Sequence, residues 1–393
     1  MSVYKFFPEK DATLYSAYPA QNTGLDEILE VSTTYLPDTP QVSRFLIQFA
    51  QTEINSFIDG TISGSVTDAT GSLLTSSKDF KADLRCFIAD ISGLNTDTTL
   101  EVFPLYQSWN MGTGKMHDVP KTENGCSWKY RISSGSGPWA SDPGSVPDNV
   151  SYNFLENNPG GGVWYSSTVN NGFNNIDVTG EQILSYADDK DIKVDVTNPI
   201  KLMYSGSLVL ENNGFIVKQS NSDEFQSDEA KVTNIKYFSI DTHTIYPPHL
   251  DVKWRDWTFN TGSSTTTIID TEDLIASIDN NGMDFRRDSI QKFYINCRPQ
   301  FPKRAFKTSS VYTTNYYLPT ASYYAVKDLD TNEFVIDFDT NYTQISADDK
   351  GSYFKLYMNG LEPERYYQIL VKTEINGSTL VLDDNYYFKV ING

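Results

Sequence analysis

The feature that most constrains the fold is an alternation of apolar and polar residues with a period of two, which recurs along the first 250 residues. The alternating runs are short and rich in Val, Ile, Phe, Tyr and Thr, and Gly, Asn, Asp and Pro separate them. Short runs of this kind between turn residues are typical of antiparallel sheets. The pattern therefore predicts an all-β domain with strands at residues 42–49, 83–88, 99–106, 192–196, 215–218, 231–240 and 249–254.

A second group of alternating runs fills the C-terminal third, at residues 291–297, 322–327, 333–338, 353–358, 366–373 and 386–391. About six or seven strands in roughly 100 residues suit an immunoglobulin-like or fibronectin-III-like β-sandwich. Tyr367 follows Leu361 and Pro363 just ahead of a late strand, which predicts the tyrosine corner of such sandwiches. Asn376 and Gly377 predict a tight hairpin turn.

The chain has 393 residues, which exceeds the roughly 250 to 300 residues that one core usually serves. A polar run at residues 261–264 interrupts the strands. We therefore predict two domains, at residues 1–257 and 258–393. Two short helices are expected as well, at residues 181–186 and 273–278, because each run follows a threonine that could serve as N-cap.

Charge narrows the classes of partner. The chain has 31 basic and 51 acidic residues, a formal net charge of −20. Such a surface repels phosphate backbones and anionic lipid, so we expect no nucleic-acid partner and no membrane partner. The first residues lack the apolar stretch of a secretory signal. The cysteines, Cys86, Cys126 and Cys297, are odd in number and far apart, and we expect them to be reduced.

Tryptophans are the candidate functional residues, because four of six fall within residues 109–164 among Gly, Pro, Ser and Asn. We interpret Trp109 and Trp128 as a structural cluster packed beneath a glycine-rich loop. Trp139, Trp164 and Tyr165 lie in or beside a long loop. Their rings could form an exposed platform for a glycan, a subunit interface or a self-packed cluster, and the sequence leaves these alternatives open.

Catalytic and metal-binding signals are sparse. His117, His243 and His249 lack the spacing of zinc ligands, and no nucleophile elbow, phosphate loop or dinucleotide fingerprint is present. We therefore predict that the protein is not an enzyme and has no required cofactor. Calcium is the one ion for which the sequence offers candidates, because loop carboxylates are its usual ligands. These candidates are Asp11, Asp26 and Glu27, or Asp177 with Asp241.

A family resemblance arises from motifs spread over about residues 3–256. They are Asp11-Ala-Thr-Leu-Tyr, Asn22, Gly24, the run Ser43-Arg44-Phe45-Leu46-Ile47-Gln48-Phe49, Trp109, Gly112, Gly114, Gly125, Trp128, Ile176-Asp177-Val178-Thr179 and Asn212-Asn213-Gly214. Together they resemble the DNRLRE-type jelly-roll domain. Long segments at residues 59–79 and 135–162 exceed what a minimal domain of this type needs. The resemblance implies an N-terminal jelly-roll β-sandwich at residues 1–257.

The kind of protein that carries such a domain suggests a function. Without a visible export signal, and with a tyrosine-rich sandwich appended, the chain resembles structural proteins of tailed bacteriophages, notably of large marine phages. The resemblance implies a non-enzymatic neck, tail or baseplate protein, made in the host cytoplasm and built into the virion through contacts with copies of itself and other virion proteins. The alternative is a carbohydrate-binding module or host-glycan receptor. A glycoside hydrolase or lyase is the third hypothesis, and it would require paired carboxylates in one groove.

Overall fold

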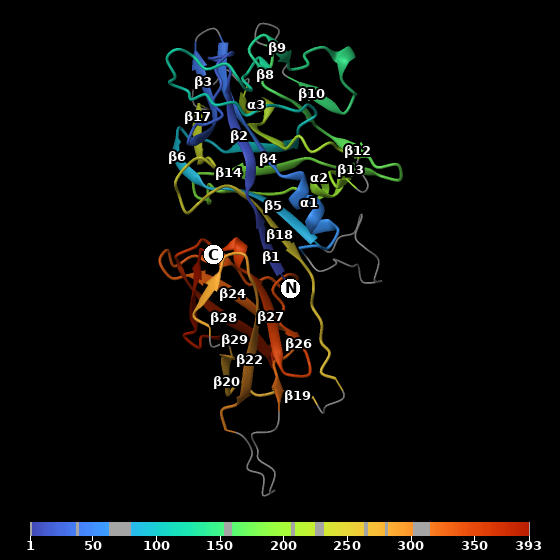
Figure 1. Cartoon of the computed structure of the whole chain (residues 1–393), viewed down its shortest axis with the longest axis vertical. Coiled ribbons are helices and arrows are strands. Elements are labelled where there is room, and N and C mark those ends of the chain that lie inside the picture. Colours follow the sequence, from blue (N-terminus) through green and yellow to red (C-terminus); the bar gives the residue numbers. More distant parts are fainter. Residues whose placement is uncertain are drawn as a thin grey trace, which may run out of the picture. The chain divides into compact units, whose positions relative to one another are not determined.

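The structure is a computed structural model of the chain (Figure 1), and it describes residues 2–36, 39–62, 80–152, 159–205, 209–224, 232–262, 266–279, 282–301 and 315–392. Strands dominate it, and the expected all-β fold is confirmed. The chain folds as two compact units. The N-terminal unit is Phe6–Asp251; the C-terminal unit is Val252–Gly393 together with Met1–Lys5.

The elements of the first 254 residues are β1 (Ser2–Phe6), β2 (Pro8–Tyr15), β3 (Ile28–Leu36), β4 (Thr39–Phe49), α1 (Gln51–Ile58), β5 (Phe80–Cys86), β6 (Ile88–Ser92), β7 (Thr98–Pro104), β8 (Tyr130–Ser133), β9 (Ser136–Pro138), η1 (Pro143–Ser145), β10 (Val150–Tyr152), β11 (Val163–Tyr165), β12 (Thr168–Asn170), β13 (Asn175–Asp177), β14 (Gly180–Leu184), β15 (Ile192–Asp195), α2 (Thr197–Leu202), β16 (Phe215–Gln219), α3 (Asn221–Glu224), β17 (Thr233–Phe238) and β18 (His249–Trp254). The seven strands predicted in this region are all present; β18 has the predicted ends, and the other six are shifted at one or both ends.

Two larger sheets organise these strands. One has eight strands in the order β14-β7-β16-β4-β3-β17-β6, and β2 also pairs with β4. The other has the order β1-β18-β5-β15. Strand β4 is central, and its alternation sends successive side chains to opposite faces. Val42 and Leu46 lie on the face that carries a tryptophan-rich core, and the buried Arg44 lies between them on the same face.

The C-terminal unit is formed by β19 (Thr267–Ile268), β20 (Leu274–Asp279), β21 (Asp284–Arg286), β22 (Ile290–Pro299), β23 (Tyr316–Tyr317), β24 (Ser322–Asp328), β25 (Phe334–Ile336), β26 (Ser346–Ala347), β27 (Ser352–Tyr357), η5 (Met358–Gly360), β28 (Tyr366–Ile375), β29 (Ser378–Leu382) and β30 (Tyr387–Ile391). They make two six-stranded sheets, β19-β23-β22-β27-β26 with β20 on β22, and β21-β30-β28-β24-β25 with β29 on β28. Tyr324 of one sheet stacks on Phe354 of the other with ring centroids 4.2 Å apart, so the core of this sandwich lies between the sheets.

Two local predictions for this unit are confirmed. The Tyr367 hydroxyl donates a hydrogen bond to the carbonyl oxygen of Glu362 at 2.9 Å, which is the tyrosine corner. Asn376 and Gly377 both have positive φ, at 53° and 85°, between the paired residues Ile375 and Ser378. Positive φ at both central residues is what a two-residue hairpin loop requires.

Both predicted helices are wrong. Residues 180–184 form β14, paired with β7, and residues 274–279 form β20, paired with β22. A two-turn helix has little stability of its own, so pairing with a neighbouring strand outweighs the weak helix signal. The helices that do form include α1, where Ile54, Phe57 and Ile58 recur at helical spacing and are buried. None of the helices in the described ranges is long and apolar enough to cross a membrane.

The two long segments are described only in part. Residues 63–79 and 153–158 lie outside the described residues. The described part of 135–162 contains β9, η1 and β10, and β10 pairs with β11. This segment is therefore partly regular and carries Trp139 into the tryptophan-rich core.

Candidate functional site

The four tryptophans of residues 109–164 meet in one core cluster of the N-terminal unit. Their neighbours in it are Ala12, Leu14, Val42, Leu46, Phe103, Leu105, Cys126, Val150, Val163 and Ile216. The indole N–H groups find backbone partners, since Trp109 donates to Asn213 O and Trp139 donates to Ser127 O, both at 2.9 Å. Trp109 and Trp128 pack inward as predicted. The cluster fastens long loops onto the eight-stranded sheet.

Burial bears on the three alternatives that the sequence leaves open for Trp139 and Trp164. Each is only 3% exposed, and Trp164 stacks on Phe103 with ring centroids 6.2 Å apart. Tyr165 is half-buried and meets Tyr106 edge to face at 5.5 Å. Self-packing therefore accounts for the two tryptophans, because an exposed platform needs ring faces that water can reach.

Asn22 is the centre of the loop assembly beside this core. It is fully buried, and its amide nitrogen donates to the carbonyls of Met111 at 2.7 Å and Cys126 at 2.8 Å. Its amide oxygen accepts from the backbone N–H of Gly114 at 2.8 Å. One side chain thus satisfies backbone groups from a loop about 90 to 104 residues away in sequence.

Glycines make this close approach achievable. A Cβ on Gly24 would lie 2.1 Å from Met111 O, and one on Gly125 would lie 2.4 Å from the Cα of Gly112. At Gly112, φ is +79° and a Cβ would come within 2.3 Å of the Asn22 side chain. Positive φ and contacts this short leave room only for glycine. Asn22, Gly24, Gly112, Gly114 and Gly125 are therefore neighbours in space.

Arg44 forms the most unusual contact of the cluster. Its Nε and Nη2 donate to the two carboxylate oxygens of Glu224, both at 2.8 Å, and its Nη1 donates to Gly161 O at 2.7 Å. The guanidinium lies 5.0 Å from the ring centroid of Trp128 and 5.1 Å from that of Trp164. Both charged side chains are inaccessible to solvent. A planar guanidinium suits this combination of a bidentate pair and ring stacking.

Lys218 extends the charge network. Its Nζ lies 3.4 Å from Glu224 Oε2 and 3.0 Å from Glu101 Oε2, and it donates to Asn221 Oδ1 at 3.1 Å. Its side chain is also fully buried, whereas Glu101 is partly exposed. Two cations thus face two carboxylates, which balances the charge beneath the glycine loop at residues 160–162.

Sequence reasoning missed Arg44 and Glu224 as partners because 180 residues separate them. One signal existed: Arg44 lies between the apolar Val42 and Leu46 on one face of a predicted strand. A charged residue at such a position is almost never fully buried unless it is paired. The sequence does not say which carboxylate completes the pair.

Asp11 is a second buried charged group, on β2. Its carboxylate accepts hydrogen bonds from Ser239 Oγ at 3.0 Å and from Ile240 N at 2.9 Å. Burial raises the pKa of Asp11 to about 7, and the nearby carboxylate of Asp241 acts in the same direction. The carboxyl group therefore changes its charge near neutral pH, inside the fold.

Three of the calcium candidates, Asp26, Glu27 and Asp177, have protein partners in the structure. Asp26 accepts from Met116 N, Glu27 lies 3.6 Å from Lys115 Nζ, and Asp177 accepts from Thr179. Across the part of the chain that the structure describes, no group of three or more His, Cys, Asp or Glu side chains could hold a metal ion. All three cysteines are free and buried.

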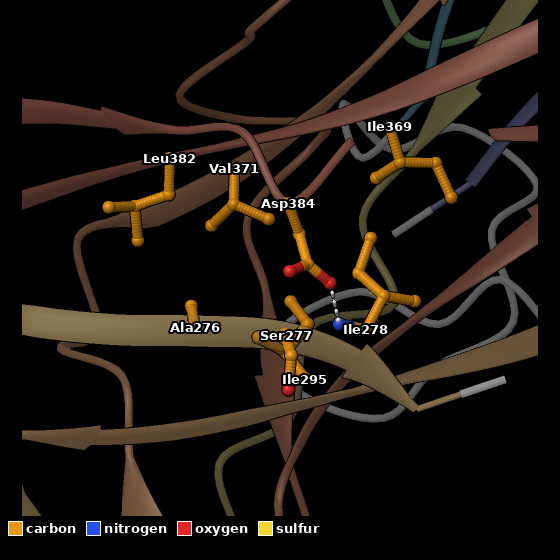
Figure 2. Close-up of a pocket in the computed structure, with 8 residues that line it drawn as sticks. All are labelled: Ala276, Ser277, Ile278, Ile295, Ile369, Val371, Leu382 and Asp384. Carbon is orange, nitrogen blue, oxygen red and sulfur yellow. Dashed lines mark hydrogen bonds between the residues drawn. The ribbon is translucent and has the colours of Figure 1, made fainter. Parts of the chain in front are cut away.

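A narrow cleft lies between β20 and the end of β29 in the C-terminal unit (Figure 2). Most of its lining is apolar, from Ala276, Ile278, Ile295, Ile369, Val371 and Leu382. The Asp384 carboxylate accepts a hydrogen bond from Ile278 N at 3.1 Å across it. Its volume is about 10 Å³, the space of one water molecule. A sugar ring does not fit there.

Comparisons with known proteins add no relative: no protein-family model, no curated protein and no solved structure matches this chain.

Proposed function

We propose that this protein is a non-enzymatic structural component of a tailed bacteriophage particle, part of its neck, tail or baseplate. The single observation that supports the proposal is the assembly around Asn22. The residues on which the resemblance to DNRLRE-type domains rests include Asn22, Gly24, Gly112, Gly114 and Gly125, and they contact one another in space. Chance matches scattered along a sequence have no reason to converge in this way.

The mechanism of such a component is geometric. The tryptophan cluster and the Arg44–Glu224 pair fix long loops on a sheet, so those loops can present a preorganised surface to neighbouring subunits. Preorganised groups lose less conformational entropy on association. A particle with rotational symmetry would carry several copies of this chain.

Glycan binding is the competing outcome. Of the rings that the sequence offered for it, Trp139 and Trp164 are buried and Tyr165 is half-buried. Within the described residues, no open platform of tryptophan rings supports a receptor function, and we do not propose it.

The test is electron microscopy of purified particles labelled with an antibody fragment against this chain, with mass spectrometry of the same particles. The expected result is label in a ring or at regular axial positions. Absence of the chain from the particles by both methods would refute the proposal. A glycan array probed with the purified chain then tests the competing function directly.

A further inference from the structure

The hairpin of β12 and β13 displays an aromatic ring to solvent. Thr168 pairs with Asp177, and Asn170 pairs with Asn175. Phe173, in the turn between them, is 91% exposed. Figure 1 shows this hairpin extending sideways from the body of the N-terminal unit. Of the large hydrophobic side chains in the described ranges, only Val119 is more exposed, at 96%.

The turn that holds Phe173 is braced by asparagines. Asn171 Oδ1 accepts from the backbone N–H groups of Phe173 at 3.0 Å and Asn174 at 2.8 Å. Asn170 Oδ1 accepts from Gly172 N at 2.7 Å, and its amide nitrogen donates to Asn175 Oδ1 at 2.9 Å. The backbone that carries the ring is thus fixed before any partner arrives, which lowers the entropic cost of binding.

The base of the hairpin is tied to the rest of the unit. Val169 is buried, Asn149 Nδ2 donates to Thr168 O at 3.0 Å, and Asn198 Nδ2 donates to Asp177 O at 2.9 Å. These contacts come from segments on both sides of the hairpin in sequence. The hairpin is therefore held at its base as well as in its turn.

Charge indicates what this hairpin can meet. Residues 157–176 contain no Asp, Glu, Lys, Arg or His, and this is the longest such run in the chain. The surrounding unit, residues 6–251, has 15 basic and 32 acidic residues, a net charge of −17. At physiological salt, charges interact over about 8 Å, so the local surface decides the repulsion between two copies. The run ends before Asp177, the exposed last residue of β13, so two copies approach with least repulsion where their turns at residues 170–176 face each other.

We propose that hairpin β12–β13 is a contact between two copies of this chain, in which the two hairpins pack against each other and Phe173 is the central anchor. The same patch on both copies gives a two-fold contact. This inference rests on the proposed function, in which copies of the chain neighbour one another. A hairpin offers less than the roughly 1,200 Å² of a stable interface, so the free dimer is a weak one. A particle would strengthen it by holding copies at high local concentration.

The test is sedimentation equilibrium of the full chain from about 5 to about 500 μM, at low and high NaCl. We expect a monomer–dimer equilibrium that high salt does not weaken, because the facing turns are uncharged and the surrounding repulsion is screened. Phe173→Ser should weaken dimerisation about tenfold or more, as loss of an aromatic anchor does. Tyr186→Ser is the matched control, because Tyr186 is 87% exposed outside the hairpin, and it should leave dimerisation unchanged.

Cross-linking locates the contact. Asn174→Cys places a thiol beside Phe173, while the native cysteines are buried. Mild oxidation should then give a disulfide-linked dimer, and Tyr186→Cys should not. A wild-type chain that stays monomeric at both salt concentrations, or a Phe173→Ser chain that dimerises like the wild type, overturns the pairing. A monomeric chain that is present in particles refutes this pairing alone; a dimeric chain absent from particles refutes the proposed function alone.

Discussion

At the scale of single residues, the buried Arg44–Glu224 pair has the largest energetic consequence. Glu224→Gln leaves the buried Arg44 without a carboxylate partner, and Arg44→Met leaves Glu224 with only the longer contact to Lys218, at 3.4 Å. Breaking a buried ion pair in this way costs about 3 to 5 kcal/mol. We therefore expect Arg44→Met and Glu224→Gln each to lower the unfolding free energy of the N-terminal unit by that amount. The double variant should lose less than the sum, because it carries neither charge of the pair, while Lys218 keeps its contact with Glu101.

Urea unfolding followed by tryptophan fluorescence measures this cycle. Lys193→Met is a suitable control, because Lys193 is exposed on β15 and should have little effect. Additive single losses in the double variant would mean that the two side chains do not act as a pair.

Asp11 makes the stability of the N-terminal unit depend on pH near neutrality. Burial raises its pKa from 3.8 to about 7, so between these values the folded chain keeps a proton that the unfolded chain has released. This contribution to stability is complete below pH 4 and is lost as pH rises toward 7, at up to about 1.4 kcal/mol per pH unit. Asp11→Asn removes the ionisation, so the variant should gain stability relative to wild type as pH rises from 5 to 8.

Paired unfolding curves of wild type and Asp11→Asn at pH 5, 6, 7 and 8 measure the difference. Asp188→Asn is the control, in an exposed turn. A difference between wild type and Asp11→Asn that does not change with pH would show that Asp11 titrates as an ordinary surface carboxyl.

At the scale of elements, the loop over the tryptophans depends on glycine for two separable reasons. Gly161 and Gly135 have the same φ of +77°, but a Cβ on Gly161 would lie 2.6 Å from the Trp128 ring, whereas Gly135 has open space. Gly135→Ala should cost about 1 kcal/mol, the strain of a left-handed residue. Gly161→Ala should cost clearly more, because it also displaces Trp128 and weakens its contact with Arg44.

Thermal unfolding and near-ultraviolet circular dichroism of both variants distinguish the backbone strain from the clash with the Trp128 ring. Only Gly161→Ala should change the tryptophan signal. Equal destabilisation by the two substitutions would mean that the ring yields without cost.

The tyrosine corner offers an element-scale test in the C-terminal unit. Tyr367 is 1% exposed and donates to Glu362 O, while its neighbour Tyr366 is 44% exposed. Tyr367→Phe removes one buried hydrogen bond and should cost about 1 kcal/mol. Tyr366→Phe should leave the unfolding free energy unchanged in the same denaturation assay. If both variants lose the same unfolding free energy, the hydrogen bond from the Tyr367 hydroxyl to Glu362 O does not account for the loss.

Strands could be predicted from sequence because alternation reports which face is buried, as in residues 42–49 and 366–373. The two wrongly predicted helices fall on the edge strands β14 and β20, each of which pairs with a neighbour on one side only. Their short runs alternate less clearly between apolar and polar residues than the runs of central strands do. The burial of Trp139 and Trp164 could not be predicted, since it depends on where a long loop folds back. Arg44 and Glu224 show the same limit, because the sequence does not reveal that these two residues meet in the folded chain.

At the scale of the whole molecule, charge is divided unequally. Residues 6–251 have a net charge of −17, whereas the C-terminal unit, with 16 basic and 19 acidic residues, has −3. Self-repulsion destabilises a compact unit, and salt screens it. Raising NaCl from about 20 mM to about 500 mM should therefore stabilise the N-terminal unit markedly and the C-terminal unit little.

Differential scanning calorimetry of the full chain measures this difference, provided that each transition is assigned to a unit. Two variants make the assignment: Arg44→Met should lower only the transition of residues 6–251, and Tyr367→Phe only that of the C-terminal unit. The transition that Arg44→Met shifts should be the one whose midpoint temperature rises by several degrees when NaCl is added. If the other transition rises instead, the repulsion is not where the formal charges place it, and acidic residues of the N-terminal unit must already be compensated in the folded state. In that case the neutral run at residues 157–176 would lose its electrostatic advantage as a contact between copies, so the salt dependence also tests the premise of the hairpin pairing.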